Sequence, residues 1–425
     1  MLLSICARAL LRLNSAFASA ILLLASVPAL AQELTLTDAL SRVAHADPSV
    51  AVAAAQREAA DAAIRQADIK PQDVVTVEVE DLARTGPYTP VIGTQATAWY
   101  ERTWERGGKR EARVSAARSD RDVTEQRSRL RQLDILAQVQ VAWVEAMTAQ
   151  AEIPIMLERL ALAQRLEREV ARRVDRALDP LFALERARTA VAQARIAYEQ
   201  AIEQARIERA SLAAWWGEGP DFKLDTTAFS GVTQSTAGDA EPVDLILLDA
   251  ERDAAQARAR LAETNGAIDP TLRAGLRYYG EGQGSGVSIV VGGAIPLGGR
   301  HAQRGNVERA EAERRVAEAE IAVMRVQTKR ETDRLRAVRA AALTEIRRID
   351  DAVLPSAERA VVLVRDGYSR GGTAFTFLEV AQAQQALIDA YDRRVSLLRQ
   401  YHLDGARLDR LTGRHASLLT SAEKR

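Results

Sequence analysis

The hydrophobic pattern of this chain changes between the period of a strand and the period of a helix, and it does so twice in the same order. Residues 75–80 alternate valine with polar residues, and a second strand-like run follows at about 92–104. After residues 107–108 the pattern becomes helical, and at residues 176–180 it turns into a return helix. Two strands, a long helix and a return helix recur between residues 270 and 413, so the sequence predicts a duplicated fold.

The two return helices share one spacing. Hydrophobic residues recur three and then four positions apart in both, which predicts a seam that packs along another helix. Leu184 in the first seam lies 196 positions before Val380 in the second. The glycine pairs before the long helices begin at Gly107 and Gly298, which are 191 positions apart. The second copy therefore carries about five more residues between its glycine pair and its return helix.

Several residues mark where the predicted helices start, bend or stop. Thr37 is the expected N-cap of the first helix, with Asp38 in its first turn. The Asp47-Pro48 pair breaks this helix early. Pro154 is expected to kink the first long helix, and Gly217 is expected just past the end of the first return helix.

The first residues read as a secretory leader. Arg8 and Arg12 precede a short apolar run at 17–27, and Ala29-Leu-Ala31 is a small-residue cleavage site. We expect cleavage after Ala31, which also removes the only cysteine and leaves no disulfide or thiolate metal site. The remaining sequence shows no run typical of a membrane-spanning helix, so any membrane insertion would have to use strands.

These boundaries give an organisation of two repeats joined by a linker that is rich in Gly, Pro, Ser, Thr and Asp. The predicted segments are a signal peptide at 1–31, a first repeat at 32–217 with strands at about 73–82 and 91–105, a linker at 218–242, a second repeat at 243–413 with strands at about 270–279 and 286–296, and a C-terminal tail at 414–425.

Composition narrows the class of protein. Hydrophobic residues make up 47% of the chain but aromatic residues only 4%, which suits long helices packed along narrow seams. The 58 basic residues balance 58 acidic ones, and the two kinds are interspersed along the helices. A net charge of zero argues against a nucleic-acid-binding protein and favours solvated helix surfaces.

Strands of about ten residues have the length of tilted membrane strands, but four of them cannot close a barrel. Several chains would have to share one barrel, and three chains would supply twelve strands around a polar lining. The lining would carry Glu78, Glu80, Arg273 and Arg277. The alternative is a small soluble sheet beside a helical bundle. In the same way, Trp99, Tyr100 and Trp104 either sit at a membrane interface or pack under the helices.

Several segments, in the same order, resemble the outer-membrane efflux proteins, the TolC-like outer-membrane factors. The shared segments are Leu34-Thr-Leu-Thr-Asp-Ala-Leu40, Gly367-Tyr-Ser-Arg-Gly-Gly-Thr373 and Phe377-Leu-Glu-Val-Ala-Gln-Ala-Gln384. Two junction motifs are similar to the cobalt–zinc–cadmium (CzcC-type) branch of that family: Gly107-Gly-Lys-Arg-Glu-Ala-Arg113, and Pro296-Leu-Gly-Gly-Arg300 with Arg304-Gly-Asn306.

The resemblance implies a mostly helical protein with a membrane β-barrel. It implies a homotrimer in the outer membrane of a Gram-negative bacterium, whose twelve-stranded barrel continues into a periplasmic helical tunnel. Its partners would be a periplasmic membrane-fusion adaptor and an inner-membrane, proton-driven transporter of the RND type. The implied function is export of divalent heavy-metal cations, without catalysis or a cofactor.

The resemblance also assigns roles to residues. The periplasmic tip, where family members meet the adaptor, matches Arg176, Leu178, Asp179, Gly371, Gly372 and Thr373. Candidates for a tunnel constriction are Glu379 and Gln382, of which only Glu379 is acidic, and Glu379 is otherwise read as a solvated surface residue. The barrel–helix junctions are marked by Gly107, Gly108, Pro296, Gly298 and Gly299. The first tip lacks the glycine that family members carry in this turn.

Other activities have less support. The chain's histidines, His45, His301, His402 and His415, include no pair at the helical spacing of a metal site, and no nucleophile–base set or paired-carboxylate motif is found. Two alternatives remain open: a duct of the same fold that exports organic compounds or a secreted protein, and a secreted periplasmic scaffold or adaptor.

Overall fold

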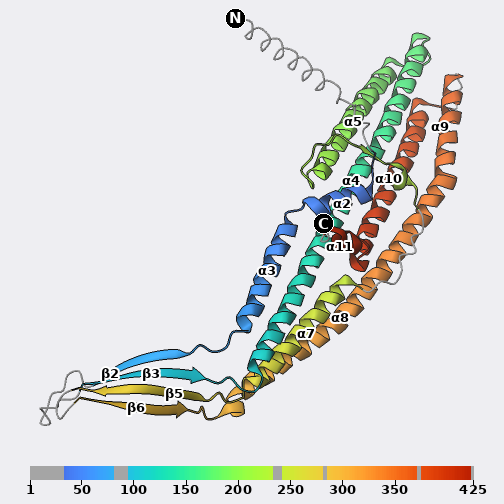
Figure 1. Cartoon of the computed structure of the whole chain (residues 1–425). Coiled ribbons are helices and arrows are strands. Elements are labelled where there is room, and N and C mark those ends of the chain that lie inside the picture. Colours follow the sequence, from blue (N-terminus) through green and yellow to red (C-terminus); the bar gives the residue numbers. More distant parts are fainter. Residues whose placement is uncertain (1–32, 81–93, 233–241, 281–284, 371–374, 423–425) are drawn as a thin grey trace, which may run out of the picture. The chain divides into compact units, whose positions relative to one another are not determined.

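The described part of the chain divides into two compact units, and each unit takes segments from both repeats. Unit 1 comprises Met1–Ala46, Val139–Gln234 and Ala341–Leu403, and unit 2 comprises Asp47–Gln138, Ser235–Ala340 and Asp404–Arg425. The expected signal peptide lies outside the described residues. The computed structural model describes residues 33–80, 94–232, 242–280, 285–370 and 375–422 (Figure 1).

Unit 2 contains a four-stranded antiparallel sheet at the positions that the alternating pattern predicts. Its strands are β2 (Val74–Glu80), β3 (Gln95–Thr103), β5 (Thr271–Tyr279) and β6 (Gly286–Ala294). The order is β2-β3-β5-β6, so the central pair joins one strand from each repeat. In this chain both β2 and β6 are edge strands with one side unpaired within the described sheet.

Each strand of the sheet is followed or preceded by a helix of unit 2 (Figure 1). The helices are α3 (Ser49–Ala67), α4 (Lys109–Asp175), α7 (Val243–Thr264) and α8 (Gly299–Arg348). Both α4 and α8 also contribute residues to unit 1. The helix α4 runs through Pro154 without interruption, so the expected kink stays a prediction. No helix in the described ranges has the combined length and hydropathy needed to cross a lipid bilayer.

Helices make up most of unit 1. They include α2 (Leu36–Ala46), α5 (Leu181–Ala213), the π-helix η1 (Ile349–Val353), α9 (Leu354–Ser369) and α10 (Phe377–Thr412), which extends into unit 2 and is followed there by α11 (Ala416–Ala422). The two predicted seams meet in one buried cluster. Its members are Leu166, Val170, Ala183, Leu184, Ala187, Tyr368 and Val380.

The extra residues of the second repeat fall in two places. The helix α9 ends at Ser369, 194 positions after the end of α4 at Asp175, whereas α10 begins 196 positions after α5. About three of the inserted residues therefore lengthen the descending helix, and about two lengthen the turn. The π-helix ends at Val353, two residues before Pro355, and its widened turn accommodates the missing backbone N–H of this proline.

The N-cap of the first helix was predicted at the wrong threonine. Thr35, not Thr37, caps α2: its hydroxyl accepts from the backbone N–H of Asp38 at 3.2 Å, and the Asp38 carboxylate accepts from the Thr35 N–H at 3.2 Å. This reciprocal pair is a capping box with Asp at the fourth position, so Asp38 has a more specific role than a charge near the helix dipole.

The predicted linker is more ordered than its composition suggests. Within residues 218–232 it forms β4 (Lys223–Leu224), which pairs in parallel with β1 (Glu33–Leu34), and the short helix α6 (Thr227–Ser230). Phe222 and Phe229 are 8% and 3% exposed. Two buried aromatic side chains anchor this segment in unit 1, which the many turn-forming residues around them conceal in the sequence.

Arg410 ties the end of α10 into unit 2. Its guanidinium donates to both carboxylate oxygens of Asp244 on α7, at 3.2 and 3.0 Å, and to Asp134 on α4. One turn later Gly413 ends α10 with a φ of +65°, and Gly217 has a φ of +75° after α5. Gly217 thus has the left-handed backbone of a helix-terminating glycine, but it lies three residues past the C-cap Ala214 and not directly after the helix as predicted.

Candidate functional site

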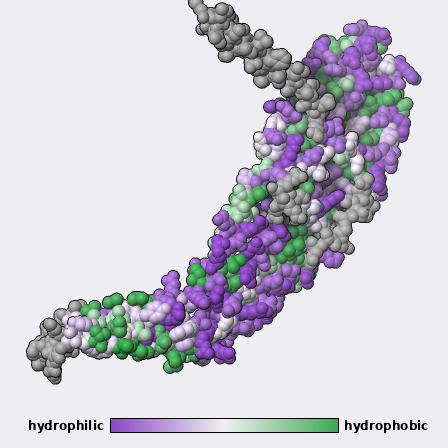
Figure 2. Space-filling view, viewed as in Figure 1, coloured by the Kyte–Doolittle hydropathy of each residue, from purple (hydrophilic) through white to green (hydrophobic). Residues whose placement is uncertain are grey.

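One face of the sheet is hydrophobic and exposed. Residues that pair in register lie on the same face, so the odd-numbered valines of β2 share a face with hydrophobic residues of β5 and β6. Figure 2 shows hydrophobic surface over these strands. The side chains, between 45% and 78% exposed, are Val75, Val77, Val79, Leu272, Leu276, Tyr278, Val287, Ile289 and Val291. A contiguous face of this kind needs an apolar environment outside the chain.

The opposite face is polar, as predicted. The register places Glu78, Glu80, Arg273 and Arg277 together on it. The Arg277 Nε donates to the Thr97 hydroxyl at 3.0 Å, and its guanidinium lies 3.9 Å from the Glu80 carboxylate. The sheet thus separates a hydrophobic surface from a charged one, which is the division that a membrane strand needs between lipid and water.

The aromatic residues of β3 divide between packing and exposure. Trp99 is 7% exposed, with the Arg273 guanidinium 4.5 Å from its ring centre. Its ring lies over Gly275, where a Cβ would come within 3.0 Å of the indole. The packing alternative therefore holds for Trp99. Tyr100 and Trp104 remain 45% and 46% exposed and are free to meet a membrane interface.

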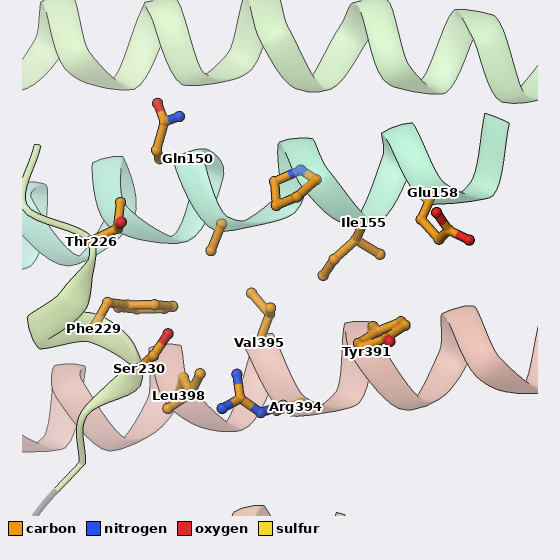
Figure 3. Close-up of a pocket in the computed structure, with 12 residues that line it drawn as sticks. Gln150, Ile155, Glu158, Thr226, Phe229, Ser230, Tyr391, Arg394, Val395 and Leu398 are labelled. Atoms are coloured by element: carbon orange, nitrogen blue, oxygen red, sulfur yellow. The ribbon is translucent and has the colours of Figure 1, made fainter. Parts of the chain in front are cut away.

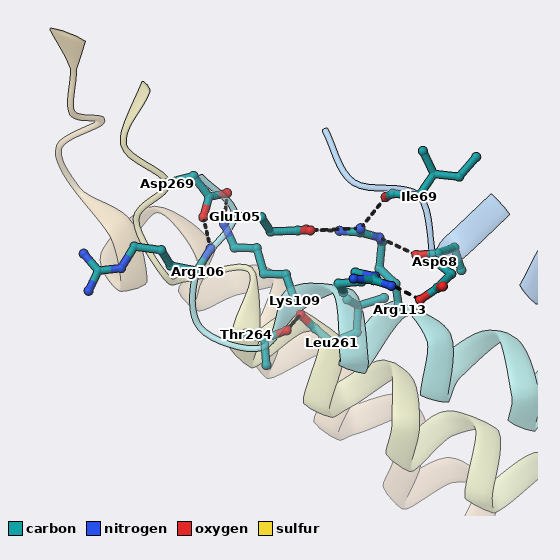
Figure 4. A network of polar contacts seen from close by, with 11 residues as sticks. Asp68, Ile69, Glu105, Arg106, Lys109, Arg113, Leu261, Thr264 and Asp269 are labelled. Atoms are coloured by element: carbon teal, nitrogen blue, oxygen red, sulfur yellow. Dashed lines mark hydrogen bonds and ion pairs between the residues drawn. The ribbon is translucent and has the colours of Figure 1, made fainter. Parts of the chain in front are cut away.

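The first junction between sheet and helix depends on two glycines. Gly107 and Gly108 have φ values of +74° and +75°, which only glycine adopts at low cost. A Cβ at Gly107 would lie 2.3 Å from that of Ala267. The next residue, Lys109, donates to the Asp269 carboxylate at 2.6 Å. The chain leaves β3 and enters α4 through this tight, fixed turn (Figure 4).

Two further basic residues of the junction motif hold the end of α3. Arg110 donates to Asp68 at 2.9 Å. Arg113 donates to the Glu105 carboxylate and, at 3.2 Å, to the backbone oxygen of Ile69 (Figure 4). The basic residues of the motif thus bind acidic residues in the segments that precede β2, follow β3 and precede β5. The sequence reasoning noticed the motif but missed the acidic partners, which lie in other elements.

The second junction also passes through two glycines with positive φ values. Gly298 and Gly299 have φ values of +102° and +25°. A Cβ on Gly299 would lie 3.0 Å from the Gly266 oxygen, so the backbone of α8 starts close to the end of α7. Pro296 lies in the connection before these glycines. Four of the five predicted junction residues therefore lie between a strand and a long helix, and Gly299 is the first residue of α8.

At the predicted tip, in unit 1, three side chains bind the two helical hairpins together. The Arg173 guanidinium donates to both oxygens of Asp179, at 2.9 and 3.1 Å, and to the backbone oxygen of Tyr368 at 2.7 Å. The Tyr368 hydroxyl donates to Asp179, and the guanidinium lies 4.3 Å from the tyrosine ring centre. We call these three residues the tip clasp. Sequence reasoning placed Asp179 at the tip, quoted Tyr368 only within the family-like segment 367–373, and missed Arg173.

The other predicted tip residues have different surroundings. Arg176 is exposed, and Leu178 is 55% exposed. Gly371, Gly372 and Thr373 lie outside the described residues. Asp179 is only 14% exposed at its side chain, so it holds the turn rather than offering a free carboxylate.

Acid should weaken the tip clasp. Burial alone would raise the pKa of Asp179, but the hydrogen bonds from Arg173 and Tyr368 outweigh it and hold this pKa below its usual 3.8. A carboxylate with a lowered folded-state pKa stabilises the fold fully above its unfolded pKa, and this contribution is lost as the pH falls through the folded value. We expect Asp179→Asn to be less stable than the wild type at pH 7, and the difference to shrink below about pH 4. Denaturation at a series of pH values tests this; a constant difference contradicts it.

The first tip turn uses alanine where most helix ends use glycine. The Leu178 N–H donates to the Arg173 oxygen at 2.8 Å and the Ala177 N–H to the Val174 oxygen at 2.9 Å, which is a Schellman ending of α4. Ala177 takes the left-handed position with a φ of +57°. This conformation costs a residue with a Cβ about 1 to 2 kcal/mol. The departure from the family's glycine is therefore tolerated at a cost in strain.

Ala177→Gly should stabilise the tip. Removing the Cβ relieves the left-handed strain, and the greater freedom of glycine in the unfolded chain offsets part of the gain, which leaves about 0.5 to 1 kcal/mol. Denaturant unfolding measures it, with Ala192→Gly, at an exposed position inside α5, as the control that should lose about 1 kcal/mol. Equal losses in both variants would mean that the left-handed position carries no strain.

Glu379 has a structural partner within the chain. Its carboxylate accepts from the backbone N–H of Thr376, at the start of α10, which completes half of a capping box. The Thr-x-x-Glu spacing was visible in the sequence and was not used. Both Glu379 and Gln382 are exposed, so capping does not bury either candidate.

A cavity of about 610 Å³ lies in unit 1, between α4, α6 and α10. Figure 3 shows Glu158, Phe229, Tyr391 and Arg394 among its lining residues. Two of its polar side chains already have partners: the Tyr391 hydroxyl donates to Glu358 at 2.8 Å, and Arg394 pairs with Asp350. Burial and this bond raise the pKa of Tyr391 to about 12. In the described part of the chain, no group of three or more His, Cys, Asp or Glu side chains is arranged to hold a metal ion.

Comparison with known proteins supports the outer-membrane family. No protein-family model matches the sequence. The cobalt-zinc-cadmium resistance protein CzcC of Cupriavidus metallidurans is 27% identical over 394 residues, which cover 90% of each chain.

Solved structures share the fold over most of the chain. The outer membrane protein VceC of Vibrio cholerae has a TM-score of 0.68 at 21% identity, and the match covers 89% of this chain and 96% of that one. CusC, described as a transmembrane channel, has a TM-score of 0.71 at 16% identity over 92% of both chains. The outer-membrane channel OprN has a TM-score of 0.71 at 15% identity over 89% of both. With its motifs, its sheet and its long helical hairpins, the chain has the fold of the TolC-like outer-membrane channels, and its sequence is similar to that of the cobalt-zinc-cadmium resistance protein CzcC.

Proposed function

We propose that three copies of this chain form an outer-membrane exit duct for divalent heavy-metal cations. The observation that carries the proposal is the two-faced sheet with unpaired edges. Its hydrophobic face requires lipid, its polar face requires water, and β2 and β6 each require a partner strand. If β6 of one copy pairs with β2 of the next, three copies close a barrel of twelve strands around a hollow interior. In this barrel no strand edge is unpaired, the hydrophobic face meets lipid, and the polar face lines the water-filled interior.

The helices of each copy would continue this wall into the periplasm. In the proposed assembly the tip meets a periplasmic membrane-fusion adaptor, and through it an inner-membrane, proton-driven transporter of the RND type. Arg176 and Leu178 are exposed in the first turn and are the proposed contacts there. Glu379 and Gln382 are proposed to line the tunnel just inside the tip. The protein itself needs no cofactor or catalytic group for this role.

The cargo assignment rests on the similarity to CzcC and on the two junction motifs. The basic residues of the first motif hold α3, α4 and the sheet together. The motif therefore supports a shared architecture with the branch, but it gives no direct information about the cargo. Export of organic compounds or of a secreted protein by the same fold is the competing function. A secreted scaffold is less favoured, because the exposed hydrophobic face would then be wet.

Deletion of the gene tests the cargo. We expect the deletion strain to lose tolerance of zinc, cobalt or cadmium, and to regain it when the intact gene is returned on a plasmid. Tolerance of a panel of organic toxic compounds should stay unchanged. Drug sensitivity with normal metal tolerance would replace the metal-export proposal by the competing one. The same strains should carry the protein in the outer-membrane fraction.

A further inference from the structure

The connection between β6 and α8 exposes hydrophobic side chains beyond the end of the sheet. Leu297 is 91% exposed and Ile295 is 67% exposed. No other large hydrophobic residue in the described ranges is as exposed as Leu297. Neither side chain is needed for packing within this copy. Each therefore either contacts a hydrophobic partner outside the chain or lowers the solubility of the protein.

The strand β6, this connection and the start of α8 contain basic residues but no acidic ones. Residues 286–307 contain no aspartate or glutamate, yet Arg300, His301 and Arg304 follow one another there. All three are exposed. The structure gives Arg304 one partner, Glu308, at 2.8 Å, in a pair whose side chains are 74% and 63% exposed. At the first junction, by contrast, the basic side chains are held by acids from neighbouring elements.

Helix stability does not account for these basic residues. They lie in the first two turns of α8, which has no acidic residue in its first turn. Positive side chains near a helix N-terminus oppose the helix dipole, typically by about 0.3 to 1 kcal/mol each. An external negative partner would offset this cost, whereas none of the described contacts does so for Arg300.

The position of the segment indicates what the partner is. Arg102 pairs with Leu272, which pairs with Gly293, and these residues lie on the hydrophobic face. Arg102 is the first charged residue of that face toward the helices, and it is bound to Asp73. This row therefore marks the end of the hydrophobic band. Ile295 lies two residues past Gly293, so the exposed segment is located where the hydrocarbon of a membrane gives way to its headgroups.

We infer that the β6–α8 junction is a docking surface for anionic phospholipids of the periplasmic leaflet. Ile295 and Leu297 enter the boundary of the acyl chains, and Arg300 and Arg304 bind the headgroup phosphates. Arginine suits this task because its planar guanidinium donates two parallel bonds to a phosphate. The inference rests on the proposed outer-membrane location and adds a lipid preference to it.

Vesicle insertion tests the lipid preference. The purified channel is offered to vesicles of phosphatidylcholine alone and to vesicles in which part of this lipid is replaced by phosphatidylglycerol, and flotation measures the inserted fraction. We expect the wild type to favour the anionic vesicles by about fivefold or more, the effect of about 1 kcal/mol per basic residue near a charged surface. Arg300→Gln with Arg304→Gln should lose this preference.

Matched variants separate charge from hydrophobic contact. Arg315→Gln with Arg325→Gln alters two exposed arginines farther along α8 and should keep the wild-type preference. Leu297→Asn should insert less into both kinds of vesicle. An unchanged preference in the Arg300 and Arg304 variant overturns the inference, as does a loss of trimer without a change in preference, which would make the segment a contact between copies. A wild type that enters neither kind of vesicle contradicts the proposed function instead.

Discussion

Val77→Arg should abolish assembly in the outer membrane. Val77 is 68% exposed at the centre of β2, and its row on the hydrophobic face continues through Ala98 and Leu276 to Ile289. Arginine at the middle of a bilayer costs about 2 to 4 kcal/mol per site, and a trimer carries the substitution three times. Fractionation of cells, followed by electrophoresis of unheated and heated samples, measures the assembled fraction.

The neighbouring residue provides the control. Thr76 is also exposed on β2, but it points to the polar face beside Trp99. Thr76→Arg adds the same side chain one position away and should assemble nearly as well as the wild type, because its charge remains in water. If both variants assembled equally well, the hydrophobic face would not be in contact with lipid, and the sheet would not support the proposed membrane barrel.

Arg410→Ala should cause the largest loss of stability in the helical part of the protein. The side chains of Arg410 and Asp244 are only 17% and 18% exposed, and Asp134 shares the guanidinium. Removing one partner of a buried ion pair leaves the other charge without compensation and typically costs about 3 to 5 kcal/mol. We expect about 3 kcal/mol, because Asp134 is half exposed and remains hydrated. Pulse proteolysis across a denaturant series measures the change.

An exposed ion pair made by another arginine of α10 gives the comparison. Arg393 pairs with Glu345 at 2.7 Å, but their side chains are 57% and 44% exposed. Arg393→Ala should therefore cost less than about 1 kcal/mol. Asp244→Asn added to Arg410→Ala should recover part of the loss, since it removes the uncompensated charge. A loss for Arg410→Ala no larger than for Arg393→Ala would show that the buried pair contributes little.

The order of elements was predictable because it depends on local period. Alternation fixed β2 to within about two residues, and the glycine pairs located the starts of α4 and α8. These signals involve residues that are close in sequence. Gly217 could be predicted to end a helix for the same reason, and the structure gives it a left-handed backbone.

The partners of charged residues were not predictable from one sequence. Lys109 and Asp269 are 160 positions apart, and Tyr368 and Asp179 are 189 positions apart. Their pairing depends on how elements of the two repeats pack against each other, and the periodicity of a sequence does not predict this packing. The two-residue strand β4 and the one-turn helix α6 of the linker were missed because each is too short to show a period. At Thr35 the error was a choice between two threonines two residues apart, which helix boundaries often allow.

The central claim is that one chain supplies only a third of the wall of a duct. The direct test is the mass of the assembly purified from outer membranes in detergent, measured by light scattering with the bound detergent subtracted. The account predicts the mass of three mature chains, and dissociation to single chains when the sample is heated. A single chain that stays monodisperse in buffer without detergent would contradict it.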